Sequence, residues 1–200
     1  MSQFVKFCIF IALALIPEIV LAHSPIKGIG NLFNGILHPL FAPAQLLSII
    51  ALGLWFGQNQ PAKHQITVLA YLFAVIAGLL ASYFSLRFNV SMALLLGASG
   101  IGLLIVSNFK FPSLVYIAGA VLLGFAIGLD SIQDDLSRKE KIISLFGNGV
   151  GIYFLLLYAL ALSESFSKKA WQTIAVRVLA SWISASALMV LSLNYFVNKG

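Results

Sequence analysis

The chain has 200 residues, of which 60% are hydrophobic and 9% are charged, and its mean hydropathy is +1.01. A water-soluble domain of this length cannot bury so much apolar surface in one core, so the composition excludes the soluble globular classes. Twelve basic residues against six acidic ones give a formal net charge of +6, which in a membrane protein lies near anionic lipid. We therefore expect a lipid bilayer as partner and no nucleic acid. Cys8 is the single cysteine, so the chain forms no internal disulfide.

The first 22 residues have the pattern of a secretory signal peptide. Lys6 precedes an apolar run over residues 7–21, and the ending at Ala22 predicts cleavage before His23. A proline and a glutamate late in this run favour a signal over a stable anchor. The alternative is an uncleaved first helix, which would give seven transmembrane helices in place of six.

Cleavage would leave His23 at the start of the mature chain. An imidazole beside a free α-amine can chelate copper or nickel. Pro25 weakens the square-planar version of such a site, because its missing N–H cannot supply a backbone nitrogen. The alternative reading of His23 is a solvated terminal residue.

Six apolar segments follow the signal, and each has the length of a transmembrane helix. They lack the alternation of barrel strands, so residues 23–200 are predicted to form one all-α polytopic membrane bundle of six transmembrane helices. The segments are 29–57, 65–86, 89–108, 111–130, 142–163 and 170–197.

Orientation follows from the exported N-terminus. We expect a multi-pass protein of the bacterial inner membrane, with the mature N-terminus and the 130–141 loop on the periplasmic side. Lys168 and Lys169 would then lie near the cytoplasm. The positive-inside rule does not decide the orientation, because the outer loops hold as many basic residues as the inner ones.

Glycines and a few polar or aromatic residues interrupt the apolar segments. Small residues four apart let helix backbones approach closely, which is the role predicted for Gly124, Gly128, Gly147 and Gly151. Gln45 and Asn148 are predicted to form hydrogen bonds between helices. Arg177 either reaches the cytoplasmic surface or pairs with Glu164. Trp55 and Trp171 are predicted as interfacial anchors, and Trp182 is predicted to face protein or lipid tails.

The most distinctive stretch opens the first apolar segment. It reads His38-Pro39-Leu40 after a glycine-rich entry, and the same segment ends near Gly53-Leu54-Trp55. Together with the Ala22-His23 signal ending and six segments, this stretch resembles the HupE/UreJ family of small integral membrane proteins. That family is associated with nickel supply to hydrogenase and urease.

The resemblance implies a metal-ligand motif, His-Pro-x-x-Gly-x-Asp-His, in the first helix, with a methionine four residues later. Histidine and carboxylate on successive turns can hold a divalent ion at membrane depth. The present chain keeps His38 and Pro39, and the remaining motif positions are Ala42, Ala44, Gln45 and Ile49.

A second family motif, His-Gly-x-Ala-His-Gly-x-Glu, lies in the fourth helix. The corresponding residues here are 123–130, Leu-Gly-Phe-Ala-Ile-Gly-Leu-Asp. The glycines and the terminal acid, Asp130, are kept, whereas both histidines are aliphatic. Because a neutral amide is a poor substitute for imidazole toward nickel, most of the implied nickel ligand set is replaced.

The resemblance predicts transport or supply of a divalent metal of the nickel type, with His23, His38 and Asp130 as candidate ligands. No cofactor is expected other than such an ion, nickel or copper. His38 is a ligand or proton relay, or it is bonded to a carbonyl freed by a nearby proline. The alternative function is an accessory subunit that packs against other membrane subunits or a second copy. Since no nucleophile–base pair or phosphate loop is present, no enzyme is expected.

Overall fold

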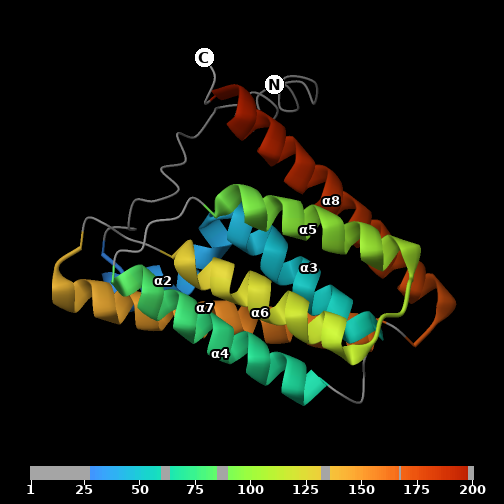
Figure 1. Ribbon diagram of the computed structural model, residues 1–200, viewed down its shortest axis with the longest axis horizontal. Coiled ribbons are helices and arrows are strands. Elements are labelled where there is room, and N and C mark those ends of the chain that lie inside the picture. Colours follow the sequence, from blue (N-terminus) through green and yellow to red (C-terminus); the bar gives the residue numbers. More distant parts are fainter. Residues whose placement is uncertain (1–27, 60–63, 85–89, 132–135, 167, 198–200) are drawn as a thin grey trace, which may run out of the picture.

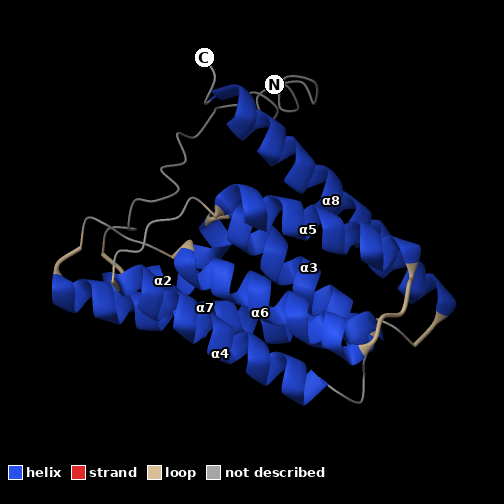
Figure 2. Ribbon diagram, in the orientation of Figure 1, coloured by secondary structure: helices blue, strands red, loops and turns tan. Residues whose placement is uncertain are grey.

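The computed structural model describes residues 28–59, 64–84, 90–131, 136–166 and 168–197, and this part of the chain consists of helices and short connecting loops, with no strand (Figures 1 and 2). The predicted signal peptide and His23 lie outside the described residues. The helices are α2 (Gly30–Phe41), α3 (Pro43–Asn59), α4 (His64–Tyr83), α5 (Ser91–Ser107), α6 (Ser113–Leu129), α7 (Arg138–Ser165) and α8 (Ala170–Val197).

The first apolar segment differs from the single helix predicted for it. It is divided into α2 and α3, whose axes meet at 74°. The break lies at Ala42, which is extended at φ −96° and ψ 100°. A residue before proline is driven out of the helical region by the proline ring, and Pro43 follows Ala42 directly. The α3 helix then begins with Pro43, where the missing N–H costs nothing.

The helix directions alternate along the chain. Early Ser48 of α3 donates to the Leu94 carbonyl early in α5 at 2.9 Å, and late Gln58 meets Asn108 just after α5. Gly53 and the later Gly57 of α3 pack against Ala159 and the later Ser163 of α7, so α3 is parallel to both helices. In α5 and α8, by contrast, Ser184 donates to the Ser99 carbonyl at 2.8 Å while the earlier Arg177 meets the later Val106, so the two are antiparallel. This alternation is typical of a chain that crosses a layer repeatedly.

Glycines lie at the closest helix contacts. A Cβ added to Gly78 of α4 would overlap the Phe125 carbonyl of α6 and lie 2.9 Å from the Cα of Gly128. Gly147 and Gly151 of α7 lie equally close to the backbone of α2, at Leu32 and Ile36. Backbone approach of this kind is the packing mode of membrane helices, where van der Waals contact replaces the hydrophobic effect.

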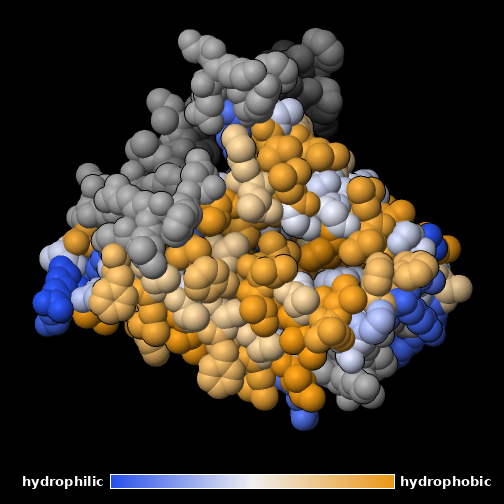
Figure 3. Space-filling model, in the orientation of Figure 1, coloured by the Kyte–Doolittle hydropathy of each residue, from blue (hydrophilic) through white to orange (hydrophobic). Residues whose placement is uncertain are grey.

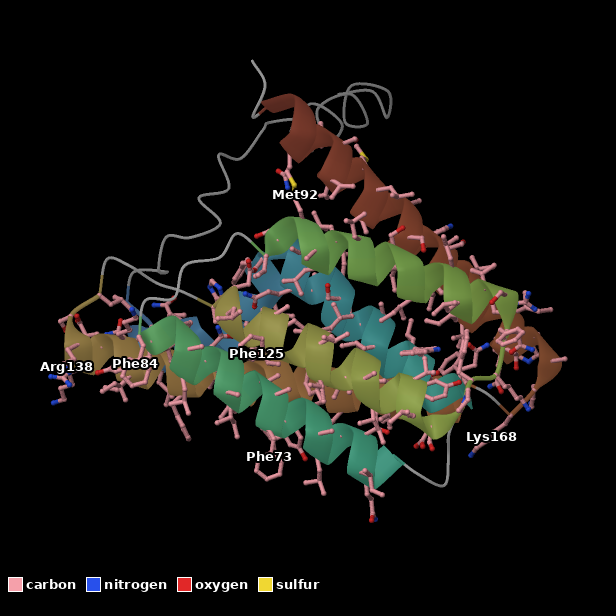
Figure 4. The ribbon with its side chains drawn as sticks, viewed as in Figure 1. Phe73, Phe84, Met92, Phe125, Arg138 and Lys168 are labelled. Atoms are coloured by element: carbon pink, nitrogen blue, oxygen red, sulfur yellow. The ribbon has the colours of Figure 1, made fainter. Side chains whose placement is uncertain are left out.

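The outer surface is apolar around the middle and charged at the ends. Figure 3 shows a broad hydrophobic face with hydrophilic residues gathered at its two sides. Figure 4 places Arg138 and Lys168 at these opposite ends, with Phe73 projecting from α4 between them and Phe84, just after α4, near Arg138. Phe73 is 69% exposed, which is costly in water and favourable in hydrocarbon. The arrangement is that of a membrane protein.

Three described helices, α4, α7 and α8, are long and apolar enough to cross a bilayer, and the α2–α3 pair makes a fourth if it is one broken span. The α5 and α6 helices are apolar but have only 17 residues each.

The tryptophans divide between the interior and the surface. Trp55 is 2% exposed and packs its ring 4.5 Å from that of Tyr116, measured between centroids. The prediction that Trp55 is an interfacial anchor is therefore wrong, because aromatic neighbours from α6 and the preceding loop enclose it. Trp171 and Trp182 are 58% and 67% exposed, so both face outward.

Candidate functional site

Gln45 occupies the first turn of α3, immediately after the break at Ala42. Its side chain is completely buried. Breaks in transmembrane helices recur at ion and substrate sites, because the interrupted helix ends present unpaired backbone groups to the bundle interior. The break thus places a polar side chain and a helix N-terminus together inside the bundle.

The carboxylate of Asp130 lies against this helix end. Asp130 follows the last residue of α6, and its Oδ2 accepts a hydrogen bond from Nε2 of Gln45 at 3.1 Å. Its Oδ1 accepts a hydrogen bond from Oγ of Ser91 at 2.7 Å. We call Gln45, Ser91 and Asp130 the Asp130 junction. It joins three helices that are far apart in sequence.

Two helix N-termini contribute to the electrostatics of the junction. Ser91 is the first residue of α5, and Gln45 is the third residue of α3. Each N-terminus carries positive partial charge, roughly half an elementary charge, from its unpaired N–H groups. Hydrogen bonds to an ionised acceptor are about twice as strong as neutral ones. The fold therefore compensates the carboxylate with oriented dipoles from two side chains and two helices.

Two buried amides near the junction have unused hydrogen-bonding capacity. Oε1 of Gln45 and both amide atoms of Asn148 have no hydrogen-bond partner within the part of the chain that the structure describes. Leu79 of α4 lies close to both Gly128 of α6 and Gly149 of α7, so these two glycines are at a similar height along the bundle. Asp130 and Asn148 are each within one helical turn of these glycines, so they share a layer of the bundle.

The two amides of this layer are fully buried, whereas Asp130 and Ser91, at helix ends, are partly exposed. Gly149 lies 11 residues beyond the start of α7 at Arg138, which corresponds to about 16 Å along the helix. Buried polar groups at such depth are normally hydrogen-bonded, and exceptions call for an explanation. The layer of Gln45, Ser91, Asp130 and Asn148 is therefore the candidate site.

The other residues singled out in the sequence lie elsewhere or make different contacts. His38 lies in the last turn of α2 with 7% of its surface exposed, and its carbonyl accepts the Ala42 N–H at 3.1 Å. Arg177 donates from Nε to the Val106 carbonyl at 2.8 Å, near the C-terminus of α5. Since Ser91 begins α5, Arg177 and the Asp130 junction lie at opposite ends of that helix.

The atoms of the junction that could bind a metal ion are almost all oxygens. Among the described residues, no group of three or more histidine, cysteine, aspartate or glutamate side chains could hold a metal ion together. The junction offers instead a carboxylate, a hydroxyl and an amide. Ser91 was not among the residues predicted, because a serine at the start of a helix ordinarily indicates a cap.

Searches of curated proteins and of solved structures gave no match to this chain. The sequence model described as HupE / UreJ protein matches residues 11–190, which is most of the chain and includes every helix as far as residue 190. The two family motifs correspond to the segments that contribute Gln45 and Asp130, so the structure brings into contact residues from both. The chain belongs to the HupE/UreJ family.

Proposed function

We propose that this protein passes a divalent metal ion across the bacterial inner membrane, as a permease-like member of its family. The observation that carries the proposal is the contact of fully buried Gln45 with the partly buried carboxylate of Asp130, beside the α2–α3 break. A carboxylate inside a membrane bundle is costly, and such residues ordinarily lie on ion or substrate paths. The family's association is with nickel, so nickel belongs among the first ions to be measured.

The mechanism assigns distinct roles to the residues of the site. Asp130 supplies the negative charge that attracts a cation into the apolar bundle. Ser91 and Gln45 orient the carboxylate through hydrogen bonds of 2.7 and 3.1 Å. His38, buried in the last turn of α2, is the imidazole closest in sequence to the break and is assigned to the entrance of the path.

The proposal includes six crossings, with the α2–α3 pair as the first. The α5 and α6 helices would extend about 26 Å each, slightly less than the hydrocarbon thickness of about 30 Å. Bilayers adapt to such a mismatch at modest cost by local thinning. The alternating helix directions support this count. The end that carries Arg138 is assigned to the periplasm and the end that carries Lys168 to the cytoplasm.

Metal uptake by cells that express the protein tests the function. Wild-type cells should accumulate at least one ion from a panel of nickel, cobalt, manganese and magnesium above the level of empty cells. Asp130→Asn should reduce this uptake at least tenfold, and His38→Ala should reduce it less. Glu164→Gln is the matched control, since Glu164 is a partly exposed carboxylate near the opposite end of α7. Equal uptake by wild-type and empty cells for every ion would refute the proposal.

A further inference from the structure

The Asp130 junction differs chemically from a nickel site. Its potential ligands are the two carboxylate oxygens of Asp130, the hydroxyl oxygen of Ser91 and the amide oxygen of Gln45. Imidazole and thiolate ligands suit nickel, copper and zinc, whereas carboxylate, carbonyl and water oxygens suit magnesium, calcium and manganese. The three residues in contact therefore match the second group of ions.

We propose that the Asp130 junction binds a small, oxygen-preferring divalent cation of the magnesium and manganese class, with the Gln45 amide turning to present its oxygen. This inference rests on the proposed function and names the ion class for the same site. An ion at the junction would take the place of the amide hydrogens that lie between Gln45 and Asp130.

The spacing of the polar atoms fits a small ion. Nε2 of Gln45 and Oδ2 of Asp130 are 3.1 Å apart. A half-turn of the amide exchanges its nitrogen and oxygen with little change in shape, so Oε1 would take the same place. Neighbouring ligands on an octahedral ion with bonds of 2.0–2.1 Å are separated by about 2.9 Å. Six-coordinate calcium, with longer bonds of 2.3–2.6 Å, would need a separation of about 3.4 Å.

The state of the Gln45 amide is a second, independent observation. Gln45 is completely buried, and its Oε1 has no hydrogen-bond partner among the described residues. A carbonyl oxygen left unsatisfied in the interior costs about 1–3 kcal/mol. Turning this oxygen toward a cation would satisfy it, while the NH₂ group would move into the space that Oε1 now occupies. The buried amide oxygen thus has a lone pair that no hydrogen bond uses and that a cation could occupy.

Ser91 completes the arrangement from a third helix. Its Oγ lies 2.7 Å from Oδ1 of Asp130, so the hydroxyl is within reach of an ion that the carboxylate holds. A hydroxyl has two lone pairs and can keep its proton while acting as a ligand. Magnesium and manganese ordinarily retain several water ligands, so three protein side chains are sufficient.

Manganese binding to the purified full-length protein in detergent tests the inference. Manganese is paramagnetic, and its free and bound forms can be distinguished by electron paramagnetic resonance. Wild-type protein should bind manganese in a way that magnesium displaces, and Asp130→Asn should abolish the binding. Ser48→Ala is the matched control for Ser91→Ala, because Ser48 is a buried serine whose hydroxyl donates to the Leu94 carbonyl and not to Asp130. Of the two serine variants, Ser91→Ala should weaken manganese binding at least fivefold and Ser48→Ala should leave it unchanged.

Gln45→His tests ion preference directly. An imidazole at this position should raise the affinity for nickel relative to manganese at least tenfold, with nickel measured by competition against bound manganese. An unchanged ratio would overturn the inference. Elution of each variant as a single detergent-solubilised species shows that it is folded. If wild-type protein binds nickel but not manganese, the inference fails and the proposed function stands. If it neither binds nor transports any divalent ion, both fail.

Discussion

Asp130 shows how one side chain connects two sequence motifs. The acid and Gln45 are 85 residues apart in sequence, yet their side chains are 3.1 Å apart. The sequence identifies both positions through the family motifs, but it does not predict their contact. That contact depends on the 74° break between α2 and α3, which sets where the first turn of α3 lies. Ser91 could not be predicted either, because its position marks only the start of a helix.

At the residue scale, Ser91→Ala should destabilise the protein. Ser91 loses a 2.7 Å hydrogen bond to a carboxylate in this variant, for which the expected cost is about 2 kcal/mol. Thermal unfolding in detergent measures the change. Ser107→Ala is the control, since Ser107 ends the same helix and its hydroxyl donates to the Leu104 carbonyl in the last turns of that helix. A loss of stability in Ser107→Ala as large as in Ser91→Ala would contradict the expectation.

The helices as elements were largely predictable from hydropathy. Five of the six apolar segments coincide with single helices, because long apolar runs leave a chain in a bilayer no other hydrogen-bonding solution. The first segment was the exception. Its proline at position 43 indicates that Ala42 is not helical, but the proline alone does not give the angle between the two halves. Packing of α2 against Gly147 and Gly151 of α7 accompanies this angle, and that contact is tertiary.

At the element scale, two glycine substitutions should have opposite effects. Gly78→Ala should destabilise the α4–α6 pair by about 2 kcal/mol, because its Cβ would overlap the Phe125 carbonyl. Gly100→Ala should be neutral or stabilising by up to about 1 kcal/mol, since nothing lies within 4 Å of its Cβ and alanine favours a helix. Chemical denaturation in detergent compares the two. Equal destabilisation would show that the close contact between α4 and α6 is not formed.

The whole molecule is an apolar bundle with charged ends, and this much follows from the pattern of apolar and charged residues along the sequence. The aromatic interior does not follow from composition. Trp55 has the amphipathic ring expected at a membrane surface, but Phe111 and Tyr116 enclose it. An indole near the end of an apolar segment has the same sequence signature in both situations. Only the packing of α3 against α6 decides between them.

At the scale of the whole molecule, the two ends should react with reagents on opposite sides of the membrane. In a Cys8→Ser background, Lys139→Cys should react with an impermeant maleimide added to intact spheroplasts. Lys168→Cys should react only after the membrane is permeabilised. Both lysines are exposed, so a difference in labelling reflects the side of the membrane and not burial of the side chain in the protein. Labelling of both variants in intact spheroplasts would contradict a bundle that spans the membrane, and the reverse pattern would contradict the assigned orientation.

One of the three tryptophans is buried and two are exposed, so their fluorescence can report how deep each helix lies in the bilayer. Trp171 and Trp182 face outward, whereas Trp55 is 2% exposed. Lipids brominated along their acyl chains should therefore quench the fluorescence of Trp171 or Trp182 and spare that of Trp55. Variants that retain one tryptophan at a time would report where each helix lies across the bilayer, with no dye attached to the protein.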